Sequence, residues 1–103
     1  MFTIIFPVLN ERLRLESGVT RTVEYLRSIA FEDYEIIIVD NGSEDETPQI
    51  AEKLCKKYDK VRYERINVRG VGAAFRRGVE VSHGDVVGYM DIDLSTNIKH
   101  LGE

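Results

Sequence analysis

The sequence has few of the residues and runs that mark specialised classes of protein. Cys55 is the single cysteine among 103 residues, so the chain cannot form an internal disulfide, which suits a reducing, cytoplasmic compartment. Fourteen basic residues against eighteen acidic ones give a net charge of −4, which disfavours nucleic-acid binding through a basic surface. No apolar run approaches the roughly 20 residues of a membrane-spanning helix. The composition, 43% hydrophobic and 31% charged, is typical of one globular domain.

Four short segments rich in β-branched and aromatic residues predict strands, at 2–9, 34–40, 60–66 and 85–91. The first, second and fourth contain continuous apolar stretches, which are typical of strands buried on both faces. In 60–66 apolar and charged residues alternate instead, so we place that strand at an edge of the sheet.

Three helical patterns lie between the strands, at 17–30, 47–58 and 71–82. Ser17 and Thr47 are expected to cap the first two helices, because their side-chain oxygens can accept hydrogen bonds from first-turn N–H groups. Val71, Phe75 and Val79 predict the buried face of the third helix. The alternation of strand and helix predicts an α/β fold with a parallel sheet, helices on its faces and right-handed crossovers.

Ligands of parallel α/β sheets bind beyond the carboxyl ends of the strands. Four loops occupy that position in the predicted sheet, at 7–11, 40–47, 67–72 and 91–96. Three of these loops carry acidic or amide side chains, and the third along the chain carries an arginine beside two glycines. The four loops are therefore the candidate functional site.

Asp91 and Asp93 follow the last predicted strand with one residue between them. Residues i and i+2 of a strand point to the same face, so the two carboxylates repel each other unless a cation lies between them. A hard divalent cation such as Mg²⁺ or Mn²⁺ prefers oxygen ligands of this kind. The alternative is a solvated loop in which an aspartate caps the following helix.

The segment "VDNGSEDET" also has two interpretations. Asp40 ends an apolar strand, and its carboxylate can accept hydrogen bonds from a nucleobase or a ribose. The same residues are strong turn formers, because Asn41 and Gly42 readily adopt left-handed backbone conformations. The sequence alone leaves both interpretations open.

The segment "NVRGVGAAFRRG" is a candidate phosphate-binding loop. Gly70 and Gly72 allow the backbone to approach a ligand at a helix N-terminus, which favours anions. The segment matches neither of the common glycine-rich phosphate-binding patterns. Arg76 and Arg77 are expected on an exposed helix face, whereas Arg69 precedes the helix and is better placed to contact a phosphate.

Together "FPVLNE", "VDNGSEDET", "NVRGVGAAFRRG" and "GDVVGYMDIDLS" resemble the start of a family 2 glycosyltransferase of GT-A fold. The resemblance covers nearly the whole chain, with the four motifs in the family's order and spacing. The family's second motif usually reads Asp-Asp-Gly-Ser-x-Asp-x-Thr, and Asn41 departs from it here. The resemblance implies a three-layer, Rossmann-like sheet with the strand order 3-2-1-4.

The resemblance also implies roles for individual residues. The nucleotide pocket would be lined by Pro7, Asn10, Glu11, Asp40, Arg69 and Asp91. Asp40 would contact the base, and Asp91 would face the ribose or the metal. Asp93, with Asp91, would hold the Mn²⁺ or Mg²⁺ ion that bridges the diphosphate. No residue of the chain is assigned as the catalytic residue.

The implied reaction moves a sugar from a UDP- or GDP-linked donor to an acceptor. The stretch "DLST" is similar to enzymes that use polyprenyl or dolichyl phosphate, a membrane lipid phosphate, although Asn97 stands where many of them have proline. Such an acceptor implies a place at the cytoplasmic face of a membrane. We expect residues 1–103 to be one partial domain that supplies the donor site, lacks the acceptor half and transfers no sugar alone.

In the implied strand order nothing in this chain covers the outer side of strand 85–91. The stretch "VVGYM" has no lysine, proline or inward-pointing charge, the features that protect natural sheet edges. We therefore expect a homodimer that pairs through this edge.

Three other functions compete with a glycosyltransferase. A nucleotidyltransferase of related fold would need a glycine-rich, basic loop after the first strand, and "PVLNERLRLESG" has no glycine cluster. A phospho-receiver domain would need an acidic pair after the first strand and a lysine at a later strand end, and neither is present. A nucleotide-binding module without turnover stays open.

Overall fold

The computed structural model of the protein describes residues 1–67 and 70–90. Strands and helices alternate along the chain as the sequence predicts, and each observed strand lies within its predicted segment. The elements are β1 (Phe2–Val8), α1 (Leu15–Ser28), β2 (Tyr34–Asp40), α2 (Thr47–Lys57), β3 (Val61–Arg65), α3 (Val71–Val81) and β4 (Val86–Tyr89). The predicted α/β class is confirmed.

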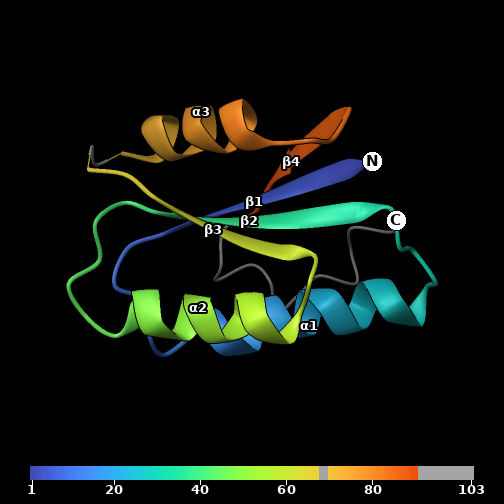
Figure 1. Cartoon of the computed structure of the whole chain (residues 1–103), viewed down its shortest axis with the longest axis horizontal. Helices are drawn as coiled ribbons and strands as arrows, with labels where there is room; N and C mark the ends of the chain where they lie inside the picture. The colour runs from blue at the N-terminus through green and yellow to red at the C-terminus, as the bar shows by residue number, and fades with distance from the viewer. Residues whose placement is uncertain (68–69, 91–103) are drawn as a thin grey trace.

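The four strands form one parallel sheet in the order β3-β2-β1-β4, which confirms the implied strand order. Helices α1 and α2 cover one face of this sheet and α3 covers the other, so the fold has three layers (Figure 1). Strands β1 and β2 pair from Phe2 opposite Tyr34 to Val8 opposite Asp40. Strand β4 pairs with β1 over a shorter stretch, from Phe2 opposite Val86 to Ile5 opposite Tyr89.

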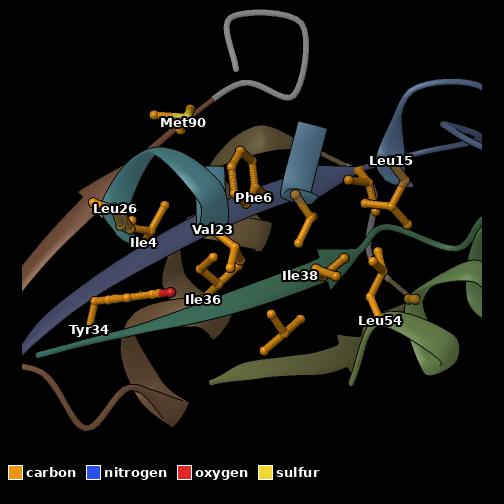
Figure 2. Close-up of a cluster of buried hydrophobic side chains, with 14 residues drawn as sticks. Ile4, Phe6, Leu15, Val23, Leu26, Tyr34, Ile36, Ile38, Leu54 and Met90 are labelled. Atoms are coloured by element: carbon orange, nitrogen blue, oxygen red, sulfur yellow. The ribbon is translucent and has the colours of Figure 1, made fainter. Parts of the chain in front are cut away.

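The larger hydrophobic core lies between the sheet and helices α1 and α2 (Figure 2). Alternate residues of β1 and β2 point into it, as the two-residue period of a strand requires. Helix α1 adds side chains at three- and four-residue spacing. The buried side chains from these three elements are Ile4, Phe6, Val8, Tyr34, Ile36, Ile38, Leu15, Val19, Val23 and Leu26.

The intervening strand residues face α3, where Ile5, Ile37 and Val39 pack against Ala74. The prediction that Phe75 and Val79 face the core is wrong, because these side chains are 40% and 42% exposed. Small residues occupy the contact instead: a Cβ atom added to Gly78 would lie 2.5 Å from Cδ1 of Ile5. The α3 backbone therefore lies so close to the sheet that larger side chains point sideways. The side chain of Val71, the third residue of the predicted face, lies outside the described part.

The predicted caps of α1 and α2 are also wrong. Helix α1 begins before Ser17, because the N–H of Leu15 already donates to the carbonyl of Glu11, and the Ser17 hydroxyl donates to the carbonyl of Arg14. Thr47 is the first residue of α2 rather than its cap. Its hydroxyl accepts a hydrogen bond from Glu11 N–H at 2.9 Å, so a tertiary contact takes the place of capping.

A buried carboxylate fastens the turn between α3 and β4 to the sheet. Glu35, on β2, accepts hydrogen bonds from the Thr3 hydroxyl at 2.8 Å, from Arg62 Nη1 at 3.0 Å and from the backbone N–H of His83. Arg62 also donates to the carbonyl of Val81 at the end of α3. Burial tends to raise the pKa of Glu35, but these hydrogen bonds outweigh it and hold the pKa below its ordinary value. This group, Thr3, Glu35, Arg62 and His83, is called the Glu35 cluster below.

Strand β4 lies at an edge of the described sheet, so the prediction that it is buried on both faces is wrong. Val86 and Tyr89 are 57% and 41% exposed, because β1 alone pairs with this strand in the described part of the chain. The predicted edge position of β3 is confirmed. A homodimer through 85–91 stays a prediction. Among the described residues no helix is long and apolar enough to cross a membrane.

Candidate ligand site at the carboxyl edge of the sheet

The loops after β1 and β2 are joined by hydrogen bonds at the carboxyl edge of the sheet. The backbone N–H of Asn10 donates to the Ser43 hydroxyl at 2.8 Å, and the N–H of Glu44 donates to Oδ1 of Asn10 at 2.8 Å. Glu11 is tied to Thr47 as described above. Two residues of the predicted nucleotide pocket, Asn10 and Glu11, therefore lie against the loop at 40–47. A pocket of about 240 Å³ is lined by Asn10, Glu11, Arg12, Leu13 and Arg14.

Pro7 lies just before this loop, within the central strand β1. Successive residues of a parallel strand direct their backbone N–H and C=O groups alternately toward the two neighbouring strands. Those of Ile5 point toward β4, since its carbonyl accepts a hydrogen bond from Met90 N–H. The backbone of Pro7, two residues on, therefore points toward the same side of β1, beyond the described end of β4. No hydrogen bond between the described strands needs an N–H group at this position, so proline is tolerated there. Its placement in the predicted pocket is compatible with this geometry and stays a prediction.

Asp40 ends β2 and is fully buried. Its Oδ1 accepts hydrogen bonds from the N–H groups of Gly42 and Ser43, at 3.0 Å and 2.7 Å. Its Oδ2 accepts one from the Tyr63 hydroxyl at 2.7 Å and lies 3.6 Å from Nη1 of Arg65. The turn predicted for this segment is thus formed. The predicted contact of Asp40 with a base stays a prediction, and it would require Tyr63 or Arg65 to move away.

Tyr63 and Arg65 were not among the residues predicted for this site. They lie on β3 and point to the same face as Asp40, since alternate residues of a strand share a face. Arg65 also donates to the carbonyl of Ser43 at 3.0 Å, so it holds the loop as well as the carboxylate. Burial and the hydrogen bond to Asp40 raise the pKa of Tyr63 to about 12, so this hydroxyl remains a donor at neutral pH. The sequence signal that could have identified them is the two-residue period of "KVRYERI", which puts Tyr63 and Arg65 on one face of the strand that neighbours the end of β2.

Replacing Tyr63 with phenylalanine is expected to lower the free energy of unfolding by about 1.5–3 kcal/mol, the usual range for a hydrogen bond to a charged group. The buried Asp40 carboxylate would lose its closest side-chain donor. Urea unfolding measures the effect, with Tyr58→Phe as the control, because no hydrogen bond joins the hydroxyl of Tyr58 to a carboxylate among the described residues. Equal losses in the two variants would show that the Tyr63 hydroxyl does not support Asp40.

The start of α3 lies beside the end of β2. Nδ2 of Asn41 donates to the carbonyl of Gly70 at 2.9 Å, and Gly70 is the residue that caps α3. Gly70 has φ of 126°, a conformation that favours glycine. A Cβ atom added to Gly70 or Gly72 would meet no atom of the described residues within 4 Å, so the described part of the chain leaves the space above this turn open. A ligand could therefore approach the N-terminus of α3 closely.

The two arginines expected on an exposed face of α3 differ in the structure. Arg76 is exposed, as predicted. Arg77 is partly exposed, and it donates through Nε and Nη2 to Oε1 of Glu64, at 3.0 Å and 2.8 Å, so on that face its guanidinium group forms an ion pair. The ion pair ties α3 to β3 near the edge that carries the site.

Three predicted site residues, Arg69, Asp91 and Asp93, lie outside the described residues. In residues 1–67 and 70–90 no three histidine, cysteine, aspartate or glutamate side chains are grouped as metal ligands would be. Asp91 and Asp93, on which the metal prediction was made, lie outside this range.

Comparison with known proteins identifies the family. The family model described as "Glycosyl transferase family 2" matches residues 3–103. The chain belongs to glycosyl transferase family 2. This membership confirms the resemblance, and it argues against the nucleotidyltransferase and the receiver domain.

Two curated relatives show which members of family 2 this chain is similar to. It is 38% identical over 103 residues to the glycosyltransferase AglD of Haloferax volcanii, covering 98% of this chain and 16% of that protein. It is 39% identical over 101 residues to the dolichyl-phosphate beta-glucosyltransferase of Mus musculus, covering 91% of this chain and 31% of that protein. The chain thus spans less than a third of the length of either relative.

Solved structures of glycosyltransferases share the fold. Glucosyl-3-phosphoglycerate synthase from Mycobacterium tuberculosis, in complex with phosphoglyceric acid, matches with a TM-score of 0.69 and 27% identity, covering 90% of this chain and 33% of that one. The complex of that enzyme with Mn²⁺, uridine diphosphate and glucosyl-3-phosphoglycerate matches with a TM-score of 0.62 and 25% identity, covering 88% and 33% of the two chains. The predicted GT-A fold is confirmed.

Proposed function

We propose that this chain is the donor-binding half of a glycosyltransferase that takes a sugar from a UDP- or GDP-linked donor and transfers it to polyprenyl or dolichyl phosphate. The observation that carries the proposal is the meeting of the loop after β1, the loop after β2 and the start of α3 at one edge of the sheet. Ligands of parallel α/β sheets bind at this edge. The acceptor is suggested by the name of the mouse relative.

The described residues would contribute to donor binding mainly by fixing the backbone around the ligand. The hydrogen bonds of Asn10 and Glu11 hold the first loop against the second. The open space at Gly70 and Gly72 leaves room for phosphate oxygens at the N-terminus of α3, where the helix dipole and free N–H groups favour an anion. No acidic residue lies in the first turn of α3 to oppose that charge. Arg69, next to Gly70 in sequence, would add a positive charge.

Asp91 and Asp93 are proposed to hold a divalent cation, Mn²⁺ or Mg²⁺. Carboxylate oxygens two residues apart after a strand suit a hard cation, and a related structure contains Mn²⁺ with uridine diphosphate. When bound, such an ion neutralises negative charge on the departing nucleoside diphosphate. Strand β4 is fastened at its start by the Glu35 cluster and runs toward the carboxyl edge, and Asp91 and Asp93 follow it in the sequence.

With the proposed acceptor the reaction would need no catalytic base. A lipid phosphate is already ionised at neutral pH, so it can attack without losing a proton to the protein. We expect residues 1–103 to bind the donor nucleotide without transferring its sugar. An acceptor of this kind would bring the protein to the cytoplasmic face of a membrane.

Calorimetric titration of the chain with UDP and GDP tests the proposal. With Mn²⁺ present we expect one of them to bind with Kd of about 0.1–1 mM, or roughly −5.5 to −4 kcal/mol, because the chain spans less than a third of the length of its curated relatives. EDTA should weaken binding strongly in the wild type. In Asp93→Asn the affinity should be low with and without Mn²⁺, whereas the exposed control Asp59→Asn should behave like the wild type. Equal wild-type affinity in Mn²⁺ and EDTA would contradict the metal site.

A further inference from the structure

Asn41 and Gly42 form an Asn-Gly pair, the pair in which an asparagine side chain loses its amide most readily. In this reaction the backbone nitrogen of the glycine gives up its proton and attacks Cγ of the asparagine. The new C–N bond closes a five-membered succinimide ring, while Nδ2 takes up a proton and leaves as ammonia. Glycine has no Cβ atom to hinder the ring closure. Water then opens the ring at either carbonyl, so the products are aspartate and isoaspartate.

The chain carries its own comparison for this chemistry. It has four asparagines, and Asn41 alone precedes a glycine. The other three, Asn10, Asn67 and Asn97, precede residues with larger side chains. In an unfolded chain Asn41 should therefore deamidate faster than the other three.

The fold opposes the first step of the reaction. The N–H of Gly42 donates to Oδ1 of Asp40 at 3.0 Å. The nitrogen must lose this proton before it can attack, and the anion so formed would lie against a carboxylate, which disfavours it. The Tyr63 hydroxyl donates to the other carboxylate oxygen at 2.7 Å and so holds Asp40 in place.

The fold also restrains the asparagine itself. Asn41 is only 8% exposed. Its backbone N–H donates to the carbonyl of Val8 at 2.9 Å, and Nδ2, the leaving group, donates to the carbonyl of Gly70 at 2.9 Å. Ring closure needs freedom of both the main chain and the side chain of Asn41, and both are held. The reaction therefore requires the loop at 40–47 to open.

We propose that Asn41 is a latent deamidation site, which the closed loop at 40–47 protects and which reacts when this loop opens. The inference does not depend on the proposed function. Both products lack the Nδ2 donor to Gly70 and add a negative charge beside Asp40. Isoaspartate also adds one carbon atom to the main chain of the turn. Each deamidation event would therefore leave a permanent change that keeps the loop from closing as before.

The test measures deamidation of the wild type at mildly alkaline pH, in native buffer and in guanidinium chloride. Samples taken over time are digested at acidic pH, where the reaction is slow, and mass spectrometry follows the conversion of amide to acid in each peptide. In guanidinium chloride we expect Asn41 to react faster than Asn10, Asn67 and Asn97. In native buffer Asn41 should react at least tenfold more slowly than in guanidinium chloride, because only molecules with an open loop can react.

A pair of variants tests whether Asp40 holds the site closed. Tyr63→Phe removes the closest side-chain donor to Asp40, so we expect deamidation of Asn41 in native buffer to be about three- to tenfold faster than in the wild type. Tyr58→Phe should react like the wild type. In guanidinium chloride all three proteins should react at the same rate. A Tyr63→Phe rate equal to that of the wild type in native buffer would show that Asp40 does not protect the site.

The deamidated protein can be separated from the intact protein by anion exchange, because it carries one more negative charge. We expect it to unfold at a lower concentration of urea than the intact protein. Amide hydrogen exchange at Ala74 should also be faster, because the N–H of Ala74 donates to the carbonyl of Gly70, which has lost its contact with residue 41. Unchanged unfolding and exchange would show that the modification does not disturb the loop.

Two results for the wild type alone would overturn the inference, so it stays testable even if a variant folds poorly. If Asn41 reacts in guanidinium chloride no faster than Asn10, Asn67 and Asn97, it is not a preferred deamidation site. If Asn41 reacts equally fast in native buffer and in guanidinium chloride, the closed loop does not protect it.

Discussion

Replacing Glu35 with glutamine is expected to lower the free energy of unfolding by about 2–4 kcal/mol at pH 7. The carboxylate accepts hydrogen bonds from Thr3, Arg62 and the His83 N–H while it is almost completely buried. Glutamine has nearly the same shape, but its NH₂ group would face donors where a carboxylate oxygen accepted them. A buried donor left without a partner, together with a half-buried Arg62 that has lost its counter-charge, accounts for a loss of this size. Urea unfolding of the two proteins measures it.

The pH dependence of that loss distinguishes the contribution of the ionised Glu35 carboxylate from that of side-chain packing. The hydrogen bonds hold the pKa of Glu35 below its ordinary value of 4.5, so the carboxylate stabilises the fold above that pH. As the pH falls below 4.5 the wild type loses this contribution, whereas Glu35→Gln has no such group to titrate. The difference between the two proteins should therefore shrink in acid. An exposed control, Glu52→Gln on α2, should change the free energy of unfolding little at any pH. A Glu35→Gln loss that stays constant below pH 4 would show that packing, rather than the charge, is responsible.

The Glu35 cluster also shows where sequence patterns stop being informative. Apolar periodicity located the strands and helices, because burying one face of each element is a local requirement. A single glutamate in the apolar run "YEIIIVD" is the one sign that something polar must be buried there. Its partners Thr3 and His83 are 32 and 48 residues away, so only the tertiary fold identifies them.

The face of α3 was mispredicted for a related reason. The pattern of large apolar residues favoured Phe75 and Val79, yet the helix packs through Ala74 and Gly78. Small residues give no hydrophobic signal, although they let two backbones come together. Phe75 instead stacks at an angle on Tyr89 of β4, with ring centroids 5.9 Å apart. The size of a side chain therefore predicted burial poorly where close approach of the backbone decided the packing.

The candidate site was predicted in its position but not in its internal hydrogen bonding. The rule that ligands bind at the carboxyl ends of parallel strands placed the loops after β1, β2 and β3 at one edge, and hydrogen bonds among the first two and the start of α3 join them. The sequence could not show that the Asp40 carboxylate would form a hydrogen bond with Tyr63 and an ion pair with Arg65. It did mark Asn41 as a departure from the family motif, and the bond to Gly70 gives that departure a physical meaning.

Replacing Gly84 with alanine is expected to destabilise the protein by about 3 kcal/mol and to loosen β4 selectively. The added Cβ atom would lie 2.3 Å from Oγ1 of Thr3, 2.7 Å from the carbonyl oxygen of Met1 and 2.9 Å from the backbone nitrogen of Thr3. Two of these three atoms belong to the backbone, so no rotation of a side chain relieves the contact. Overpacking of this kind costs about 1–3 kcal/mol, and the shift would also break the bond from Gly84 N–H to the Thr3 hydroxyl.

The consequence for the donor site comes from the short pairing of β4. Four residues pair this strand with β1, flanked by the bonds from Asp85 N–H to Met1 and from Met90 N–H to Ile5. Pushing its start away from β1 should therefore speed amide hydrogen exchange at Asp85 and Met90 more than in β2. It should also weaken Mn²⁺-dependent nucleotide binding, because β4 leads directly to Asp91 and Asp93. For unfolding and hydrogen exchange, Gly72→Ala is the matched control: its Cβ meets no atom of the described residues within 4 Å, and alanine in place of glycine in a helix stabilises by roughly 0.5–1 kcal/mol. Nucleotide binding by Gly84→Ala is compared with the wild type alone, because Gly72 lies at the proposed phosphate site. If Gly84→Ala unfolds like the wild type and leaves exchange in β4 unchanged, the close approach at Gly84 does not hold this strand in place.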